Sequence, residues 1–231
     1  MKLFDSIYNP PERESDKDEA CDISSQSAPR RVKDVIIHHT SQLIELNILL
    51  IVASLPILTL PVAWFAATNI CLSLLEGKIV YVWHDFWHCI RDIWKTAFQM
   101  GIANILIFLL SGIGIVFYNK DGDLLGKLLS CACMIICIAS LLLSIYLPTM
   151  NNLTGLTIKQ KWVNAALLVP VQLKWTLATA AVDICIVFVG VGLLPYSFFI
   201  IPLIGISLLI LVNTECARHG LTTYVVKQRE R

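Results

Sequence analysis

The chain has 231 residues, of which 56% are hydrophobic and only 15% are charged, and its mean hydropathy is +0.70. Soluble domains carry about 25% charged residues, so this composition indicates an integral membrane protein. A formal net charge of +1 excludes the strongly basic surface that nucleic-acid-binding proteins use.

The N-terminal region, 1–40, is polar. Prolines at 10–11, an acidic stretch at 12–19 and serines at 24–27 leave too little apolar surface to bury, so we expect a flexible cytosolic tail. No short apolar segment with a small-residue cleavage site follows it, so no signal peptide is expected.

Next comes an uncharged run of thirty residues between Glu45 and Glu76, with Pro56 and Pro61 near its middle. A bilayer core about 30 Å thick takes about 20 apolar residues as a helix, so the run is too long for one span. It predicts a helical hairpin that folds at 55–61.

Six apolar segments follow the N-terminal region. They cover 43–60, 62–76, 101–118, 128–147, 176–194 and 196–213. Prolines stand at the ends of several of them, as they do where helices stop. The prediction is an all-α, polytopic membrane helical bundle over 41–217, followed by a cytosolic basic tail over 218–231.

The distribution of Lys and Arg sets the predicted topology. If all six segments cross and the N-terminus is inside, sixteen of the eighteen basic residues are cytosolic. If 62–76 only re-enters the membrane, the division becomes ten to eight, without a bias. The positive-inside rule therefore favours six spans with both termini in the cytosol.

The segment 82–98 is amphipathic, and its aromatic and apolar residues recur at helical spacing. Helices of this kind lie in the headgroup layer and anchor a protein there. Grouped aromatic residues are also typical of protein interfaces, so a docking helix is the alternative. The candidate docking residues are Trp83, Phe86, Trp87 and Trp94. His84 and His88 stand four residues apart, but Asp85 takes the place of the Glu of H-E-x-x-H, which favours a solvated helix face over a metal site.

Asp183 lies near the middle of the fifth apolar segment. A carboxylate at that depth is costly and suggests a functional site. The alternative is a hydrogen bond between helices that only stabilises the bundle. Asn47 and Asn104 complete the predicted intramembrane polar site, and Asn69, Ser111 and Ser144 are further candidate partners of Asp183.

Motifs for enzyme chemistry are absent from the sequence. The run Gly122 to Lys127 has only three residues between its glycines and lacks the Ser or Thr of a phosphate-binding loop. Neither G-x-S-x-G nor H-E-x-x-H occurs. The eight cysteines lie in apolar runs or on the predicted cytosolic side, where thiols stay reduced. We therefore expect no enzyme activity, no cofactor, no metal and no disulfide.

The run LNILLIVASLPILTLPVAWFAATNICLSLLEG, the later VWHDFWHCIRDIWKTAF and the opening LFDSIYNP resemble the YesL family of bacterial integral membrane proteins. Shared features are the start at 46–50, the proline turn at 54–61, the alanine pair at 66–67 and the Trp-rich stretch 83–95. Leu60 stands where the family has glycine.

The resemblance implies a bacterial protein whose relatives often lie beside genes for carbohydrate-uptake ABC transporters. The predicted function is therefore an accessory or partner component of carbohydrate uptake, with the lipid bilayer and ABC-transporter subunits, or another protein on the cytosolic side, as its partners. The alternative is an autonomous small-solute permease with a midplane site near Asp183.

Overall fold

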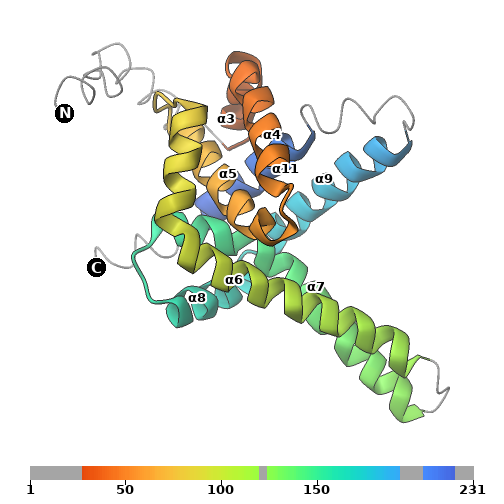
Figure 1. Cartoon of the computed structure of the whole chain (residues 1–231). Helices are drawn as coiled ribbons and strands as arrows, with labels where there is room; N and C mark the ends of the chain where they lie inside the picture. Colours follow the sequence, from red (N-terminus) through yellow and green to blue (C-terminus); the bar gives the residue numbers. More distant parts are fainter. Residues whose placement is uncertain (1–27, 120–123, 193–204, 222–231) are drawn as a thin grey trace, which may run out of the picture.

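The computed structural model describes residues 28–119, 124–192 and 205–221. Within these ranges the chain forms eight α-helices and one short 3-10 helix, with no strand (Figure 1). The elements are α3 (Ala28–His38), α4 (Thr40–Ser54), η1 (Ile57–Thr59), α5 (Leu60–Leu75), α6 (Val82–Tyr118), α7 (Leu124–Leu153), α8 (Ile158–Val171), α9 (Leu173–Gly192) and α11 (Ile206–Leu221).

Two of the described helices, α6 and α7, are long and apolar enough to cross a membrane. The pair α3 and α4 bends by 84° and the pair formed by α8 and Leu173–Phe188 bends by 91°. The number of candidate spans rises to four if each bent pair is counted as one. The all-α class and the membrane character are thus supported, whereas six spans are not confirmed within the described ranges.

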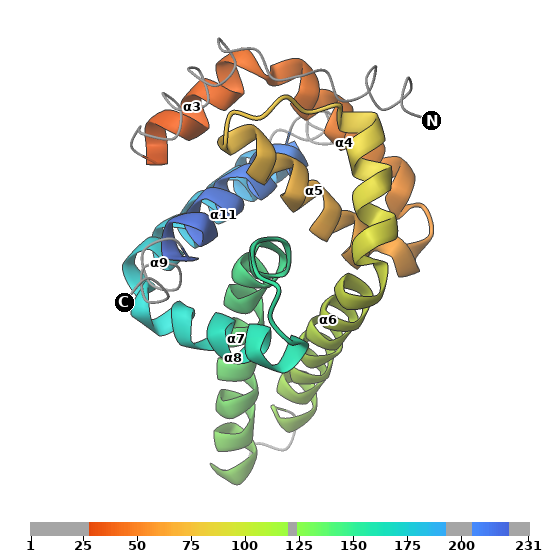
Figure 2. The ribbon, with the colours of Figure 1, turned by 90° about the vertical axis from the view of Figure 1, so that its left-hand side faces the viewer.

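Helix α6 joins two segments that the sequence predicts as separate elements. Its 37 residues correspond to a length of about 55 Å at 1.5 Å per residue. We call residues 82–100 its amphipathic half and residues 101–118 its apolar half. Figures 1 and 2 show that α6 changes direction along its length. The predicted amphipathic segment is therefore continuous with the predicted third span.

Helix α7 also differs from its predicted end, because it continues through Pro148 to Leu153. Pro148 and its neighbours Leu147 and Thr149 are buried, so tertiary packing holds the helix together where proline removes one backbone hydrogen bond.

The predicted N-terminal tail is shorter than expected, because α3 occupies residues 28–38 and buries Val35. At the other end, α11 extends to Leu221 and so includes the first residues of the predicted C-terminal tail. Residues 1–27 and 222–231 lie outside the described part, as do Pro195 and Pro202. Tertiary contacts explain the extra helix, since α3 packs against α4, α5 and α11.

Helix α5 forms the centre of the bundle. Twelve of its sixteen residues are buried, and α4, α6, α7 and α11 pack around it (Figure 2). A helix that is apolar on every side is buried either in lipid or in a protein core, and here the neighbouring helices cover it.

The apolar half of α6 and the first half of α7 project from the bundle as an antiparallel pair, which we call the α6–α7 hairpin (Figure 1). The Asn104–Ser140 contact links the two helices near the bundle. Further out Gly114 allows a close approach, since a Cβ there would lie 2.8 Å from the Sγ of Cys133. Apolar side chains are exposed on the hairpin, including Leu110, Ile113, Val116, Leu124, Leu128 and Ile135. So large an apolar surface requires lipid or an apolar partner.

Candidate functional site

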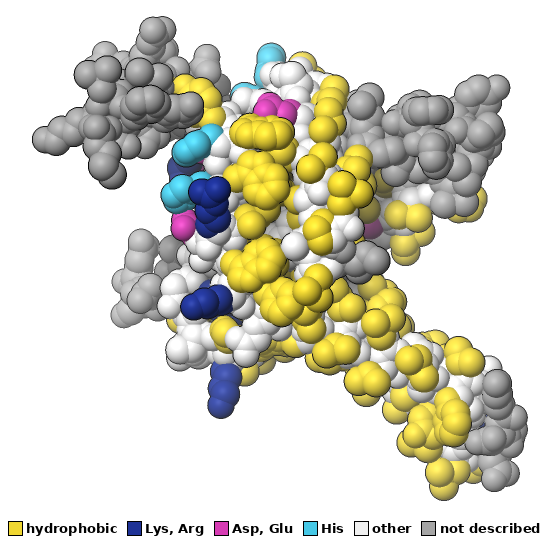
Figure 3. Space-filling model, in the orientation of Figure 1, with side chains coloured by type: hydrophobic (Ala, Val, Ile, Leu, Met, Phe, Trp, Pro, Cys, Tyr) yellow, Lys and Arg dark blue, Asp and Glu magenta, His cyan; other side chains and the backbone are white. Residues whose placement is uncertain are grey.

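The amphipathic half of α6 carries a buried face and an exposed face. Phe86, Ile90 and Ala97 point into the core, while His88, Arg91 and Lys95 are exposed. Figure 3 shows His, Lys and Arg side chains along one edge of the molecule, next to hydrophobic side chains. This arrangement agrees with an amphipathic helix at a boundary between water and an apolar phase.

The four predicted docking residues do not share one surface. Trp83 and Trp94 are 60% and 39% exposed, and Trp87 packs partly against the core. Trp94 also stacks on Phe98, with the ring centroids 6.0 Å apart. Phe86 is fully buried, so it cannot reach a partner and the structure removes it from the predicted set.

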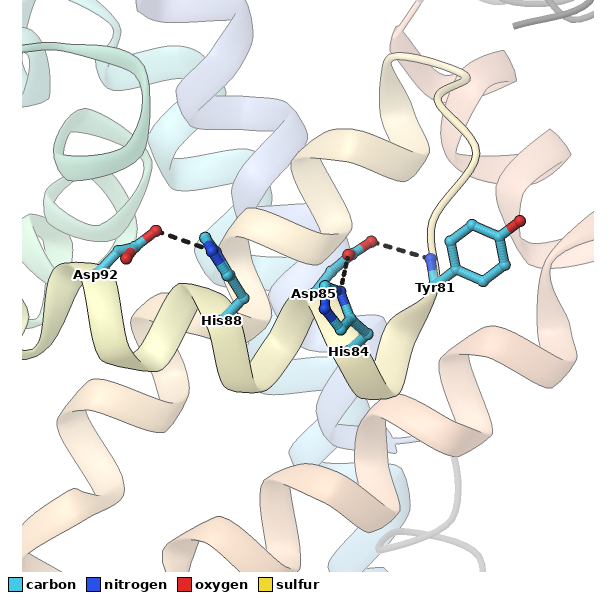
Figure 4. A network of polar contacts seen from close by, with 5 residues as sticks. All are labelled: Tyr81, His84, Asp85, His88 and Asp92. Carbon is cyan, nitrogen blue, oxygen red and sulfur yellow. Dashed lines mark hydrogen bonds and ion pairs between the residues drawn. The ribbon is translucent and has the colours of Figure 1, made fainter. Parts of the chain in front are cut away.

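His84 and His88 each contact a carboxylate on the same helix (Figure 4). His84 Nδ1 lies 3.2 Å from Asp85 Oδ1, and His88 Nδ1 lies 3.1 Å from Asp92 Oδ2. Asp85 Oδ2 also accepts a hydrogen bond of 2.9 Å from the backbone N–H of Tyr81, which satisfies a free donor at the start of α6. These contacts fit a solvated helix face with a capped start.

Asp183 lies on α9 and accepts a hydrogen bond from the side chain of Asn213 on α11. Asn213 is not among the predicted partners of Asp183. Asn47 instead accepts a hydrogen bond of 2.9 Å from the backbone N–H of Ser207, and Asn104 accepts one of 2.9 Å from the hydroxyl of Ser140. The three residues of the predicted polar site therefore each pair with a different residue, on three different pairs of helices.

Asp183 belongs to a polar stripe whose other members are Gln172, Thr176 and Thr179. Gln172 directly precedes α9, and the spacing of four, three and four residues places the other three along one side of that helix. The hydroxyl of Thr176 lies 2.6 Å from that of Tyr146 on α7, and Thr179 donates a hydrogen bond of 3.4 Å to the Sγ of Cys216.

We call this stripe, together with Tyr146, Asn213 and Cys216, the polar seam. Among the described residues, three buried acceptors in the seam have no protein donor, namely Gln172 Oε1, Asp183 Oδ1 and Asn213 Oδ1. Buried polar atoms without partners are unusual and often mark sites of function. The helical spacing of 172, 176, 179 and 183 is the sequence signal that could have revealed the stripe.

A second polar cluster joins three helices and was not predicted. Arg31 Nη2 on α3 lies 2.6 Å from Glu215 Oε1 on α11, and Arg218 Nη1 lies 3.7 Å from Glu215 Oε2. Arg218 also donates a hydrogen bond of 3.3 Å to the backbone carbonyl of Leu75 at the end of α5. The cluster therefore ties α3 and α5 to α11, and its side chains are mostly buried.

Comparison of the chain with models of protein families, with curated proteins and with solved structures finds no match. The resemblance to the YesL family therefore stays a prediction from the residues of 40–100. Within the described ranges no group of three or more His, Cys, Asp and Glu side chains could hold a metal ion. The geometry offers two candidate sites for function, the exposed aromatic residues of α6 and the largely buried polar seam.

Proposed function

We propose that this chain is an accessory membrane component of bacterial carbohydrate uptake, which assembles with the membrane subunits of an ABC transporter. The observation that carries the proposal is the α6–α7 hairpin, whose apolar side chains are exposed beyond the bundle. A solute carrier surrounds its site with helices, whereas an isolated hairpin offers its sides to lipid and to other transmembrane helices.

The cytosolic part of the partner would meet the amphipathic half of α6. Trp83 and Trp94 are exposed there, and exposed Trp residues are typical anchors of protein interfaces. The excess of Lys and Arg on the predicted cytosolic side supports an orientation with both termini in the cytosol. The resemblance to the YesL family is the reason for assigning the chain to a bacterial cytoplasmic membrane. With both termini on the same side, the chain must cross the membrane an even number of times, and six crossings are one such number. The proposal assigns the chain no enzymatic step.

Co-purification from native membranes tests this function. A tagged chain should retain the membrane subunits of a carbohydrate ABC transporter in a constant ratio after detergent extraction. The double variant Trp83→Ala, Trp94→Ala should lose these subunits, whereas His84→Ala, His88→Ala on the same exposed helix should keep them. If no transporter subunit accompanies the unaltered chain, the proposal is wrong.

The polar seam favours a second candidate, an autonomous permease for a small solute. Asp183 and Asn213 pair between α9 and α11, and each keeps one oxygen without a protein donor. Intramembrane carboxylates commonly lie on ion or substrate pathways. Purified chain in liposomes would then take up solute unaided, and Asp183→Asn would abolish uptake while leaving the fold intact. Uptake by the chain alone would favour this candidate over the accessory role.

A further inference from the structure

Helix α5 lies along the amphipathic half of α6, and three contacts define how the helices align. Pro61, at the start of α5, meets Gly101. Midway, the side-chain amide of Asn69 donates to the Sγ of Cys89 at 3.2 Å. At the other end the loop 76–81 joins the two helices. The helices are therefore antiparallel, and α5 runs beside 82–101 rather than beside 101–118.

Helix α4 lies at the same level along α6 as α5 does. Near its start, Gln42 donates a hydrogen bond of 3.4 Å to the backbone carbonyl of Val80. Its end connects through η1 to Leu60, next to the contact between Pro61 and Gly101. The turn between α4 and α5 therefore lies beside the first residue of the apolar half of α6.

This position conflicts with a crossing hairpin. The apolar half of α6 has 18 residues, from Gly101 to Tyr118, or about 27 Å at 1.5 Å per residue. A hairpin that crossed the same bilayer would place its turn beside Tyr118, where α6 ends. The observed turn falls short of that level by nearly the thickness of a bilayer core.

The exposed face of α4 is also too short for a span. Ser41 and Glu45 begin this face, and Ile48, Val52 and Leu55 complete it. Its apolar part, 48–55, covers eight residues, or about 10 Å from the first to the last, which matches the depth to which interfacial helices enter a membrane. Helix α5 has little exposed surface and needs no lipid contact.

Within the α4–α5 hairpin, apolar side chains are most exposed at the turn between the two helices. Leu55 and Leu58 are 77% and 63% exposed, and Leu60 follows them on the surface. They lie beside the start of the α6–α7 hairpin. The acyl chains of the nearer leaflet would therefore contact both the turn and the hairpin.

We propose that α4 and α5 form a re-entrant hairpin, which enters the cytosolic leaflet at 55–60 and returns to the cytosol without crossing. The proposal rests on the membrane orientation in the proposed function. It leaves sixteen of the eighteen basic residues in the cytosol, because a hairpin that returns does not change the side of the N-terminal region.

Cysteine accessibility tests this arrangement in intact cells. Leu58→Cys and Asn119→Cys, made in separate full-length chains, are treated with a membrane-impermeant maleimide and read by peptide mass spectrometry. We expect labelling of residue 119 from outside and no labelling of residue 58. Labelling of both from the same side would overturn the re-entrant hairpin.

A second measurement resolves the case in which residue 58 reacts from neither side. In the double variant Leu58→Cys, Asn119→Cys, a short bis-maleimide should form no intramolecular link, because the two positions lie at different depths. An efficient link would place the turn at the outer surface and refute the proposal. If residue 119 is labelled only from inside, the proposed orientation fails, while the comparison of 58 with 119 still tests the hairpin.

Discussion

A Cβ atom on Gly101 would lie 2.4 Å from the Cβ of Pro61, so α6 passes the start of α5 at a distance that only glycine permits. The contact fixes the alignment of the two helices. It also places the turn of the α4–α5 hairpin beside the apolar half of α6.

Replacing Gly101 with alanine should therefore destabilise the bundle, although alanine is the better helix former. Overpacking of this kind costs about 1–3 kcal/mol, which exceeds the gain of up to about 1 kcal/mol in helix propensity. Gly112→Ala is the matched control on the same helix, since a Cβ there meets nothing within 4 Å. Thermal unfolding in detergent should show a lower midpoint for the first variant and an equal or higher one for the second. Equal midpoints for both variants would contradict the close contact.

The cluster around Glu215 should respond unequally to loss of its members. Glu215→Leu would remove the carboxylate that contacts the largely buried guanidinium groups of both Arg31 and Arg218. Breaking a buried ion pair from one side costs about 3–5 kcal/mol. Arg31→Met should cost less, because Glu215 keeps Arg218 at 3.7 Å. Limited proteolysis should also release the α3 region, 28–38, more readily in both variants. A larger loss of stability for Arg31→Met than for Glu215→Leu would refute this account.

The hydrogen bond between Asp183 and Asn213 can be measured with a double-mutant cycle. If the pair only stabilises the contact of α9 with α11, Asp183→Asn should change stability little, because an amide can replace the carboxylate. Asp183→Leu should cost about 1–3 kcal/mol, because it leaves Asn213 unpaired. Adding Asn213→Leu should recover part of that loss. A folded Asp183→Asn variant that no longer supports growth on a carbohydrate whose uptake needs this protein would instead indicate a role in transport.

Burial of Lys161 should make the stability of the protein depend on pH. Its side chain is buried, and its Nζ donates a hydrogen bond of 2.9 Å to Asn151 Oδ1. Burial lowers the pKa of Lys161 below its ordinary value, because desolvation disfavours the charged form. The unfolded chain then binds this proton more tightly than the folded chain. Stability should therefore rise with pH from the lowered pKa up to about 10.4, the ordinary value for lysine.

The measurement compares unfolding midpoints of the unaltered chain and of Lys161→Gln between about pH 7 and pH 10. The unaltered chain should gain stability relative to the variant as pH rises. Lys159→Gln, at an exposed position on the same helix, should follow the unaltered chain at every pH. A parallel pH dependence in all three proteins would show that Lys161 does not titrate with folding.

The apolar hairpin of α6 and α7 could be predicted from sequence because its apolar runs are long and lie on either side of a short polar loop. The surroundings of helix α5 could not be predicted from sequence in the same way. A helix that is apolar on all sides has one sequence pattern, whether lipid or neighbouring helices cover it. Only the contacts of α5 with α4, α6, α7 and α11 distinguish the two environments.

The polar contacts divide in a similar way. The stripe that includes Thr176, Thr179 and Asp183 has a helical period and could be found in sequence. Its partner Asn213 could not, because the contact joins α9 to a later helix and no local pattern records it. The same applies to Arg31 and Glu215, which lie at opposite ends of the chain. The polarity of α3 suggested a flexible tail, but burial of Val35 and the ion pair to α11 hold this helix in place.

The place of α11 in the chain has a consequence for biosynthesis. Helix α11 packs on α5, and Arg218 bonds to the carbonyl of Leu75. Because proteins are made from the N-terminus, this side of α5 stays uncovered until α11 has left the ribosome. The nascent chain must shelter α5 in lipid or on a chaperone during that time. Truncation before α11 should therefore cause degradation of the nascent protein, even though both long apolar helices have already been inserted.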